Sequence, residues 1–277
     1  GSVVENNRLQ GPAFGVWLDA TPDVTVRENH IRGDTSLRSQ DRGNGIHLFN
    51  TTGALIEGND ISETRDAIYI ETANRNTIRD NVMSDLRYGI HYMYSMHNLL
   101  ENNVTRGTRT GYALMQSKYL KVFNNRSEND ENYGILMNFI TNSELRNNVV
   151  TGVSQGQSAG VVISGAEGKA VFIYNSLYNT FEGNYFGHSN IGIHLTAGSE
   201  ENQVFNNAFV ENQRQVKYVA TRTQSWAEDG AQSGIHDREQ LEAGLAAVAE
   251  LQSAADARVV WSRDFEDYMR AALAGDE

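Results

Sequence analysis

The chain has 277 residues, of which 39% are hydrophobic, no cysteine and a formal net charge of −12. The lack of cysteine excludes disulfides and thiolate metal sites, and no run of about 18 apolar residues is present that would span a membrane. The acidic balance, without a broad Lys/Arg patch, argues against nucleic-acid binding. The first residues are polar and show no secretory signal, and Gly1-Ser2 is typical of a cloning remnant, so we expect a fragment of a longer protein.

Asparagine recurs along the chain with a period of 22 or 23 residues, interrupted by two longer gaps. A fixed period of this length is typical of a solenoid in which each repeat forms one turn. Asn side chains in equivalent positions of stacked turns can bond from turn to turn, so we expect a structural ladder. The row begins at Asn7 and continues through Asn29, Asn59, Asn81, Asn103, Asn125, Asn148, Asn184 and Asn207.

A second repeating segment lies in phase with the asparagines: a Gly or Ala followed by alternating residues, which is the pattern of a strand. The segments are GVWL at 15, GIHL at 45, AIYI at 67, GIHY at 89, GYAL at 111, GILM at 134, GVVI at 160 and GIHL at 192. The repeat is too short for a helix pair and lacks the leucine spacing of a horseshoe. The sequence therefore predicts an all-β chain, a right-handed parallel β-helix with about three short strands per turn.

The two longer gaps in the asparagine row indicate insertions. Thirty residues separate Asn29 from Asn59, with the polar stretch GDTSLRSQDRGNG between them, and thirty-six separate Asn148 from Asn184. Insertions in repeat proteins commonly emerge on one face and bind ligands or partners.

The composition changes after residue 230. The last 42 residues contain no Asn, ten Ala and ten acidic residues against four Arg. Leu241, Leu245, Val248 and Leu251 recur at helical spacing after Asp237, which suits a helix N-cap. We therefore expect two parts, a β-helix over 1–230 and a helical tail or cap of unknown origin over 231–277.

Candidate functional residues are those that point outward from the repeated strand. The third residue of each segment is expected outside: Trp17, His47, Tyr69, His91, Ala113, Leu136, Val162 and His194. Two residues farther on come Phe49, Glu71, Met93, Met115 and Asn138. His91 and Met93 thus share a side, and Met115 lies one turn along.

The stretch YGIHYMYSMH at 88–97 holds two His and two Met. Neutral imidazole and thioether together suit copper, and thioether is especially apt for Cu(I). We take His91, Met93, Met96, His97 and Met115 as the candidate metal ligands. The alternatives are core or incidental packing, since Met often fills gaps in a solenoid, and contact with a partner.

Arginine forms a further row, Arg65, Arg87 and Arg109, in which like charges would repel unless Glu63 and Asp85 compensate them. A neutralised surface ladder is one interpretation, and a groove for an acidic partner or a uronic-acid polymer is the other. Pectate lyases and alginate epimerases use this architecture. In that alternative, Arg65 or Arg87 would neutralise the substrate carboxylate, His47 or His91 would act as base and Tyr69 as acid. The DPHD signature of alginate epimerases and an acidic cluster suited to calcium are absent from the sequence.

Residues 5 to about 229 resemble the NosD family through whole turns of the repeat. The stretches that carry the resemblance are YGIHYMYSMHNLLENN, GYALMQSKYLKVFNN and GIHLTAGSEENQVFNNAFVENQRQVKYV. The resemblance implies a periplasmic β-helical scaffold rather than an enzyme. Such a scaffold works with an ABC transporter, receives copper from a lipoprotein chaperone and passes it to nitrous oxide reductase. After Trp226–Gly230 the family's GNYWSDY-type segment is replaced by AQSGIHDREQ, so the tail over 236–277 departs from the family.

Overall fold

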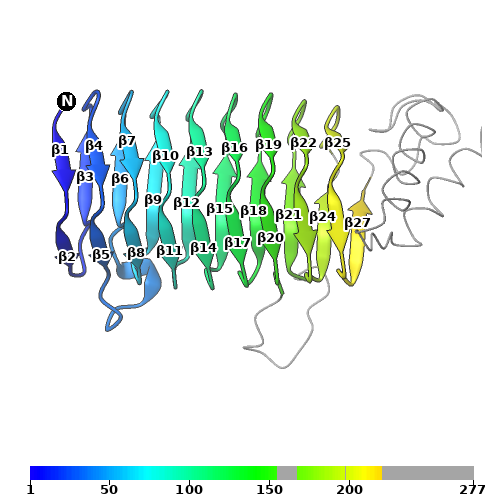
Figure 1. Ribbon diagram of the computed structural model, residues 1–277, viewed down its shortest axis with the longest axis horizontal. Helices are drawn as coiled ribbons and strands as arrows, with labels where there is room; N and C mark the ends of the chain where they lie inside the picture. The colour runs from blue at the N-terminus through cyan, green and yellow to red at the C-terminus, as the bar shows by residue number, and fades with distance from the viewer. Residues whose placement is uncertain (155–166, 197, 220–277) are drawn as a thin grey trace, which may run out of the picture.

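The computed structural model describes residues 1–154, 167–196 and 198–219. Within these residues the chain forms a parallel β-solenoid of three nine-stranded sheets (Figure 1). Neighbouring strands in each sheet come from successive turns, and their pairing is parallel throughout, as in β10 with β13 and β12 with β15. The predicted β-helix is thus confirmed. No helix among the described residues is long and apolar enough to cross a membrane.

Each turn contributes one strand to each sheet. The first sheet consists of β1 (Val3–Glu5), β4 (Thr25–Arg27), β7 (Leu55–Glu57), β10 (Thr77–Arg79), β13 (Leu99–Glu101), β16 (Lys121–Phe123), β19 (Glu144–Arg146), β22 (Thr180–Glu182) and β25 (Gln203–Phe205). The second consists of β2 (Arg8–Gln10), β5 (His30–Arg32), β8 (Asp60–Ser62), β11 (Val82–Ser84), β14 (Val104–Arg106), β17 (Arg126–Glu128), β20 (Val149–Thr151), β23 (Tyr185–Gly187) and β26 (Ala208–Val210). The third consists of β3 (Val16–Asp19), β6 (Ile46–Phe49), β9 (Asp66–Glu71), β12 (Tyr88–Met93), β15 (Thr110–Met115), β18 (Tyr133–Asn138), β21 (Lys169–Tyr174), β24 (Ile191–Leu195) and β27 (Arg214–Tyr218).

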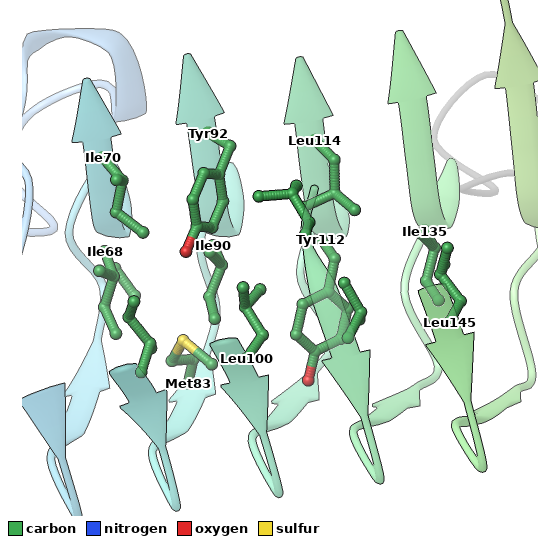
Figure 2. Packing of buried hydrophobic residues seen from close by; sticks show 14 of the residues in the cluster. Ile68, Ile70, Met83, Ile90, Tyr92, Leu100, Tyr112, Leu114, Ile135 and Leu145 are labelled. Atoms are coloured by element: carbon green, nitrogen blue, oxygen red, sulfur yellow. The ribbon is translucent and has the colours of Figure 1, made fainter. Parts of the chain in front are cut away.

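The core runs along the axis of the solenoid and is filled by one inward side chain from each short strand. Ile56, Ile78 and Leu100 occupy one such row on the first sheet, and all three are fully buried. Ile90 and Tyr92 on β12 point into the core (Figure 2). His91 between them belongs to the outer face, where its ring contacts that of Tyr69. This alternation follows from the pleat of a strand, and it confirms the inward and outward positions expected for the repeated segment. Met83 and Met137 are fully buried in this core.

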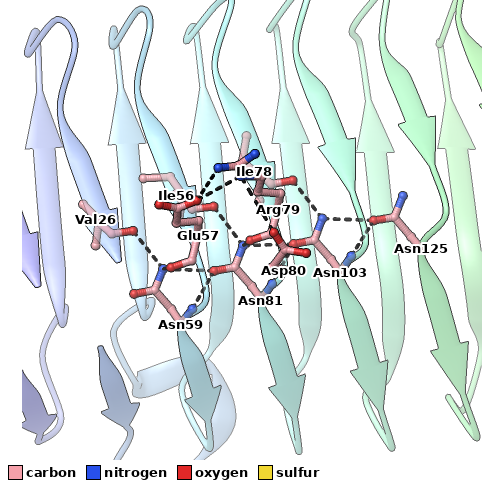
Figure 3. A network of polar contacts seen from close by, with 10 residues as sticks. All are labelled: Val26, Ile56, Glu57, Asn59, Ile78, Arg79, Asp80, Asn81, Asn103 and Asn125. Carbon is pink, nitrogen blue, oxygen red and sulfur yellow. Dashed lines mark hydrogen bonds and ion pairs between the residues drawn. The ribbon is translucent and has the colours of Figure 1, made fainter. Parts of the chain in front are cut away.

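The asparagine ladder forms as predicted, at the bend between the first and second sheets (Figure 3). Both the backbone N–H and the Nδ2 of Asn81 donate to Oδ1 of Asn103, at 3.2 and 2.9 Å, and Asn103 donates in the same way to Asn125. The row continues without a break from Asn7 to Asn207 across both insertions. From Asn29 to Asn207, each ladder Asn also donates from Nδ2 to a backbone carbonyl of the preceding turn, as Asn81 does to Ile56. The ladder therefore satisfies polar groups of a tight bend that lies out of reach of water.

A second, shorter ladder lies at the bend between the third and first sheets. The backbone N–H of Asn76 donates to Oδ1 of Asn98, and that of Asn179 donates to Oδ1 of Asn202. The sequence carries the signal for it, because each of these residues precedes a member of the first ladder by five positions. The prediction recognised only the first row.

The first predicted insertion lies between β5 and β6 and contains a short 3-10 helix, η1 (Ser39–Asp41). It hangs from the lower edge of the solenoid in Figure 1. Arg42 ties it down by donating to the carbonyls of Leu37 and Glu63. The strand predicted at 160–163 and the helical tail predicted over 231–277 lie outside the described residues. The segment that follows β18 in the third sheet is β21, with Ala170 in the place that the prediction gave to Gly160. Both segments have a small residue followed by alternating residues, so periodicity alone did not distinguish them.

Candidate functional site

The outward row of the third sheet is formed by the residues that the repeat predicts, with one correction. Trp17, His47, Tyr69, His91, Ala113 and Leu136 are paired in register from β3 to β18, and His194 lies on β24. The predicted member Val162 lies outside the described residues, and Phe172 of β21 stands between Leu136 and His194.

The rings at the start of this row are in continuous contact. Centroids are 4.1 Å apart for Trp17 and His47, 4.7 Å for His47 and Tyr69, and 4.6 Å for Tyr69 and His91. Stacked neighbours cover the imidazoles although these face away from the core, so His47 and His91 are only 7% and 8% exposed, whereas Trp17 at the end is 50% exposed. Burial lowers the pKa of His47 to about 4, with Asp66 opposing the shift. His47 is therefore a neutral imidazole near pH 7.

A buried carboxylate that sequence reasoning missed organises the middle of the row. Asp66 is 1% exposed and accepts two hydrogen bonds from Arg87, from Nε at 2.8 Å and Nη2 at 2.5 Å. Its Oδ2 lies 3.0 Å from Nδ1 of His91. Burial favours a raised pKa for Asp66, but the hydrogen bonds from His91 and Arg87 outweigh it and the pKa is lowered. Because the carboxylate accepts a hydrogen bond from Nδ1–H, Nε2 is left as the nitrogen of His91 with a free lone pair. This Nε2 is buried and has no hydrogen-bond partner among the described residues.

The arginine row is neutralised differently from the expected way. Glu63 pairs with Arg32 rather than Arg65, and Asp66 rather than Asp85 pairs with Arg87. Nε of Arg65 is buried without a hydrogen-bond partner in the described part of the chain. The residues of the lyase alternative thus lie on adjacent turns, but Arg87 is held by a carboxylate. Burial, followed by the effect of Glu71, raises the pKa of Tyr69 to about 12.

The five candidate metal ligands fall into two groups. Met93 and Met115 are direct neighbours in register on β12 and β15, and His91 lies on the same outer face two residues before Met93. Met96 and His97 follow a bend at Tyr94 and belong to the next short segment, where Met96 pairs with Lys118.

His97 stacks on Tyr119 with centroids 4.8 Å apart. Within the described residues no three His, Asp or Glu side chains come together in a way that could hold a metal ion. Among the candidate ligands on this face, Met93 and Met115 supply thioethers and His91 supplies a nitrogen.

Position 113 lies beside His91 in the neighbouring strand and carries only a methyl group. Ala113 pairs with His91, and Met115 lies diagonally across from it. The rows thus place a small side chain beside the imidazole of His91 and two residues before the thioether of Met115. The sequence showed these residues on one face, but the carboxylate behind the imidazole could not be found from the row spacing.

Comparisons with known proteins agree with this architecture and name a family. The family model described as "Periplasmic copper-binding protein (NosD)" matches residues 27–242. A "Probable ABC transporter binding protein NosD" from Pseudomonas aeruginosa is 62% identical over 230 residues, which are 83% of this chain and 54% of that protein. The protein of the same name from Stutzerimonas stutzeri is 60% identical over 228 residues, 82% of this chain and 52% of that protein. The chain thus spans about half the length of these relatives.

A solved structure shares the fold at low sequence identity. The Streptococcus pneumoniae surface protein and adhesin PfbA has a TM-score of 0.56 and 11% identity, and the match covers 78% of this chain and 66% of PfbA. This likeness concerns the fold alone. The family match and the two relatives, in contrast, cover most of the described solenoid, and on that evidence the chain belongs to the NosD family.

Proposed function

We propose that the chain is the solenoid part of a periplasmic protein that carries copper for an ABC transporter system and delivers it to nitrous oxide reductase. Copper is cargo in this function, received from a lipoprotein chaperone and passed on. The family's description as periplasmic and copper-binding and the relatives' name as ABC transporter binding proteins support the proposal. The observation that carries it is the adjacent pair Met93 and Met115 on the face of His91.

The donor set suits Cu(I) better than a hard cation. Two thioethers and one imidazole are soft or borderline ligands, and Cu(I) prefers them over carboxylates and carbonyls. A histidine that binds a metal commonly gives its other ring N–H to a carboxylate, which fixes the tautomer and raises the basicity of the binding nitrogen. Asp66 stands in that position behind His91, at 3.0 Å from Nδ1.

The arrangement also suits exchange of cargo. Met93 and Met115 are half-buried at the rim of the sheet rather than enclosed in the core. Thioethers are neutral, so copper can leave them without protonation of a charged ligand. The described residues provide no closed cage of acidic or imidazole ligands. We infer that Met93, Met115 and His91 hold the ion, and that Met96 and His97 on the next segment provide a second contact during transfer.

The test is the Cu(I) affinity of the purified chain, measured by competition with a chromophoric chelator. Met93→Leu with Met115→Leu should abolish retention of Cu(I), while the thermal midpoint stays near that of the wild type because both side chains lie outside the core. Met83→Leu with Met137→Leu is the matched control, since it removes two thioethers that are fully buried in the core. Copper binding that survives in the first variant, or that is lost equally in the control, would contradict the site.

Delivery is tested separately from binding. The chain loaded with Cu(I) is mixed with apo-nitrous oxide reductase, and copper is measured on each protein after separation. Transfer from the wild type but not from the double Met variant is the expected result. Co-purification with the ABC transporter subunits tests the other partner.

A second candidate function is a lyase or C5-epimerase acting on uronic-acid polymers, and the contact of His47, Tyr69 and His91 along one row favours it. Arg65 is the side chain left to neutralise a substrate carboxylate, since Arg87 is held by Asp66. The assay is the ultraviolet absorbance of unsaturated product from alginate or pectate, together with exchange of the C5 proton. Activity that disappears in Tyr69→Phe would establish this alternative, and inert behaviour toward both polymers excludes it.

A further inference from the structure

The bend that leads from the third sheet to the first carries a group of exposed large apolar side chains on four successive turns. It lies along the upper edge of the solenoid in Figure 1, where β12 is followed by β13 and β15 by β16. The exposed fraction ranges from 36% for Met96 to 57% for Tyr178. We call this group the aromatic corner, and it consists of Tyr94, Met96, Tyr119, Phe139, Tyr174 and Tyr178. Groups of exposed apolar side chains on neighbouring turns mark interaction sites more often than single exposed residues do.

Four members of the aromatic corner have left-handed backbone conformations. Their φ angles are 51° for Tyr94, 56° for Tyr119, 55° for Phe139 and 58° for Tyr178. Bulky side chains are unfavourable there, and Gly, Asn or Asp is the residue type that adopts this region at low cost. Strained conformations of this kind persist where another requirement maintains them.

Equivalent positions on other turns have the same left-handed conformation with various residues, among them Thr72 and Gln116 in the row of Tyr94 and His97 in the row of Tyr119. Asn50 and Asn175 occupy the place of Tyr94 and Phe139, with φ of 50° and 45°. Asn142, at φ 53°, lies between Tyr119 and Tyr178 in the other row, because its N–H bonds the turn that contains Tyr178. The solenoid thus accepts asparagine at both positions, and the aromatic residues are not needed to form the turn.

The aromatic side chains of the corner make few contacts that would stabilise the fold. Tyr94 and Tyr178 make no ring contact with another described residue, and Phe139 touches only the edge of Tyr174 at 6.2 Å between centroids. Tyr119 stacks on His97 and has Nζ of Lys118 5.7 Å from its ring centroid, yet it is 43% exposed. Their exposed area together with their backbone strain indicates that they serve contact with another molecule.

The charged side chains beside the aromatic corner indicate which charges a partner's surface would carry. Arg75, Lys118 and Lys121 lie in or next to these turns, and none of them forms an ion pair within the described ranges. Of the nearby acids, Glu144 pairs with Arg146. These three cations border the part of the corner around Tyr94 and Tyr119, whereas the exposed Glu201 lies beyond Tyr178 at its other end. Cations at this border complement carboxylates on the other side of a contact.

We propose that the aromatic corner is the docking surface for a folded protein that presents an apolar centre bordered by carboxylates. This inference rests on the proposed function, because Met93 and Met115 lie on the same turns as Tyr94 and Tyr119. A protein docked there is held next to the copper-carrying thioethers and is thus placed to give or take the ion. The corner supplies aromatic anchors in the centre and cations at the rim, as protein interfaces do.

The test is a triple variant of the full chain, Tyr94→Asn with Phe139→Asn and Tyr178→Asn. The probes are apo-nitrous oxide reductase and the soluble domain of the lipoprotein chaperone, each immobilised for binding measurements. The variant should bind the responding probe at least about tenfold more weakly, because aromatic anchors dominate such contacts. Its thermal midpoint should rise by a few degrees, because three strained positions receive the residue that suits them.

Gln116→Asn is the matched control. Gln116 is exposed at φ 45° in the same row as Tyr94 and Phe139, so its replacement relieves similar strain without removing an aromatic ring. This control should gain stability and bind the probe as the wild type does. Lys118→Glu with Lys121→Glu should slow association and reverse its dependence on salt.

The outcomes separate docking from copper carriage. The triple variant should retain wild-type Cu(I) affinity, so a wild type that binds no copper overturns the proposed function without bearing on the docking surface. Docking is overturned if the triple variant binds as the wild type does, if its thermal midpoint falls, or if neither probe binds the wild type. A falling midpoint would show that the aromatic side chains stabilise the fold.

Discussion

Replacing Asn103 by Ala removes one complete rung of the asparagine ladder. Asn103 is fully buried, and its Oδ1 accepts from the backbone N–H of Asn81 at 3.2 Å and from Nδ2 of Asn81 at 2.9 Å. Its Nδ2 donates to the carbonyl of Ile78 at 2.9 Å and to Oδ1 of Asn125 at 3.0 Å. Four hydrogen bonds at a net ~1 kcal/mol each amount to a loss of about 4 kcal/mol in the free energy of unfolding. Alanine supplies no replacement for any of them.

Urea unfolding measures the loss, and hydrogen exchange at the Asn81 amide shows whether it is local. Exchange is needed because neighbouring repeats of a solenoid can unfold separately, in which case one global free energy does not describe the protein. Asn132→Ala is the control, since the half-buried Asn132 side chain forms no hydrogen bond with another described residue; it should change stability by less than about 0.5 kcal/mol. A cost below about 1 kcal/mol for Asn103→Ala, with unchanged exchange at Asn81, would refute the assignment of a structural role to the ladder.

Three further predictions concern buried polar groups. Burial lowers the pKa of His47 from 6.5 to about 4, so between these pH values the unfolded chain binds more protons than the folded chain. The folded state therefore loses stability as the pH falls through this range. His47→Gln should reduce this loss when the free energy of unfolding is measured across the same pH range. Asp66→Asn breaks a buried ion pair and should cost about 3–5 kcal/mol in urea unfolding, and a cost under about 1 kcal/mol would contradict the pairing. Tyr112→Phe should lower the free energy of unfolding by about 1 kcal/mol, because the Tyr112 hydroxyl donates to a backbone carbonyl. Tyr92→Phe should leave it unchanged, because the Tyr92 hydroxyl has no hydrogen-bond partner among the described residues. Equal losses in the two variants would be inconsistent with this difference.

The fold could be predicted because two periodic signals agree. The asparagine row specifies the bend, and the alternating segment after each Gly or Ala specifies the strand that follows, so both together determine the register of every turn. The prediction extended correctly over both insertions, since Asn29 bonds to Asn59 and Asn148 bonds to Asn184. Only one signal was available at 160–163, because the alternation there has no asparagine to anchor it; the strand that pairs with β18 is β21, which begins at Lys169.

The candidate site was predictable only in part, for a physical reason. Register determines which residues share a row, so the pairing of Met93 with Met115 followed from the period. It does not determine which way long side chains turn. Arg87 reaches back by one turn to Asp66, and His91 reaches the same carboxylate. Met96 and His97 are close to Met93 in sequence, but the left-handed bend at Tyr94 directs them to another segment.

The solenoid allows a binding site to change without a change in the core. On β12 the inward residues Ile90 and Tyr92 pack against the preceding and following turns. His91, which lies between them, and Met93, which follows Tyr92, project from the opposite side of the same strand. Each turn is held in place by its inward side chains and by the asparagine ladder, and the side chains at the outer face take no part in these contacts. Substitution of the outward Met residues therefore removes the proposed copper donors without opening a cavity, whereas the same change at Met83 or Met137 alters packing and leaves the proposed donors in place. This separation is what makes loss of copper with unchanged stability a meaningful result.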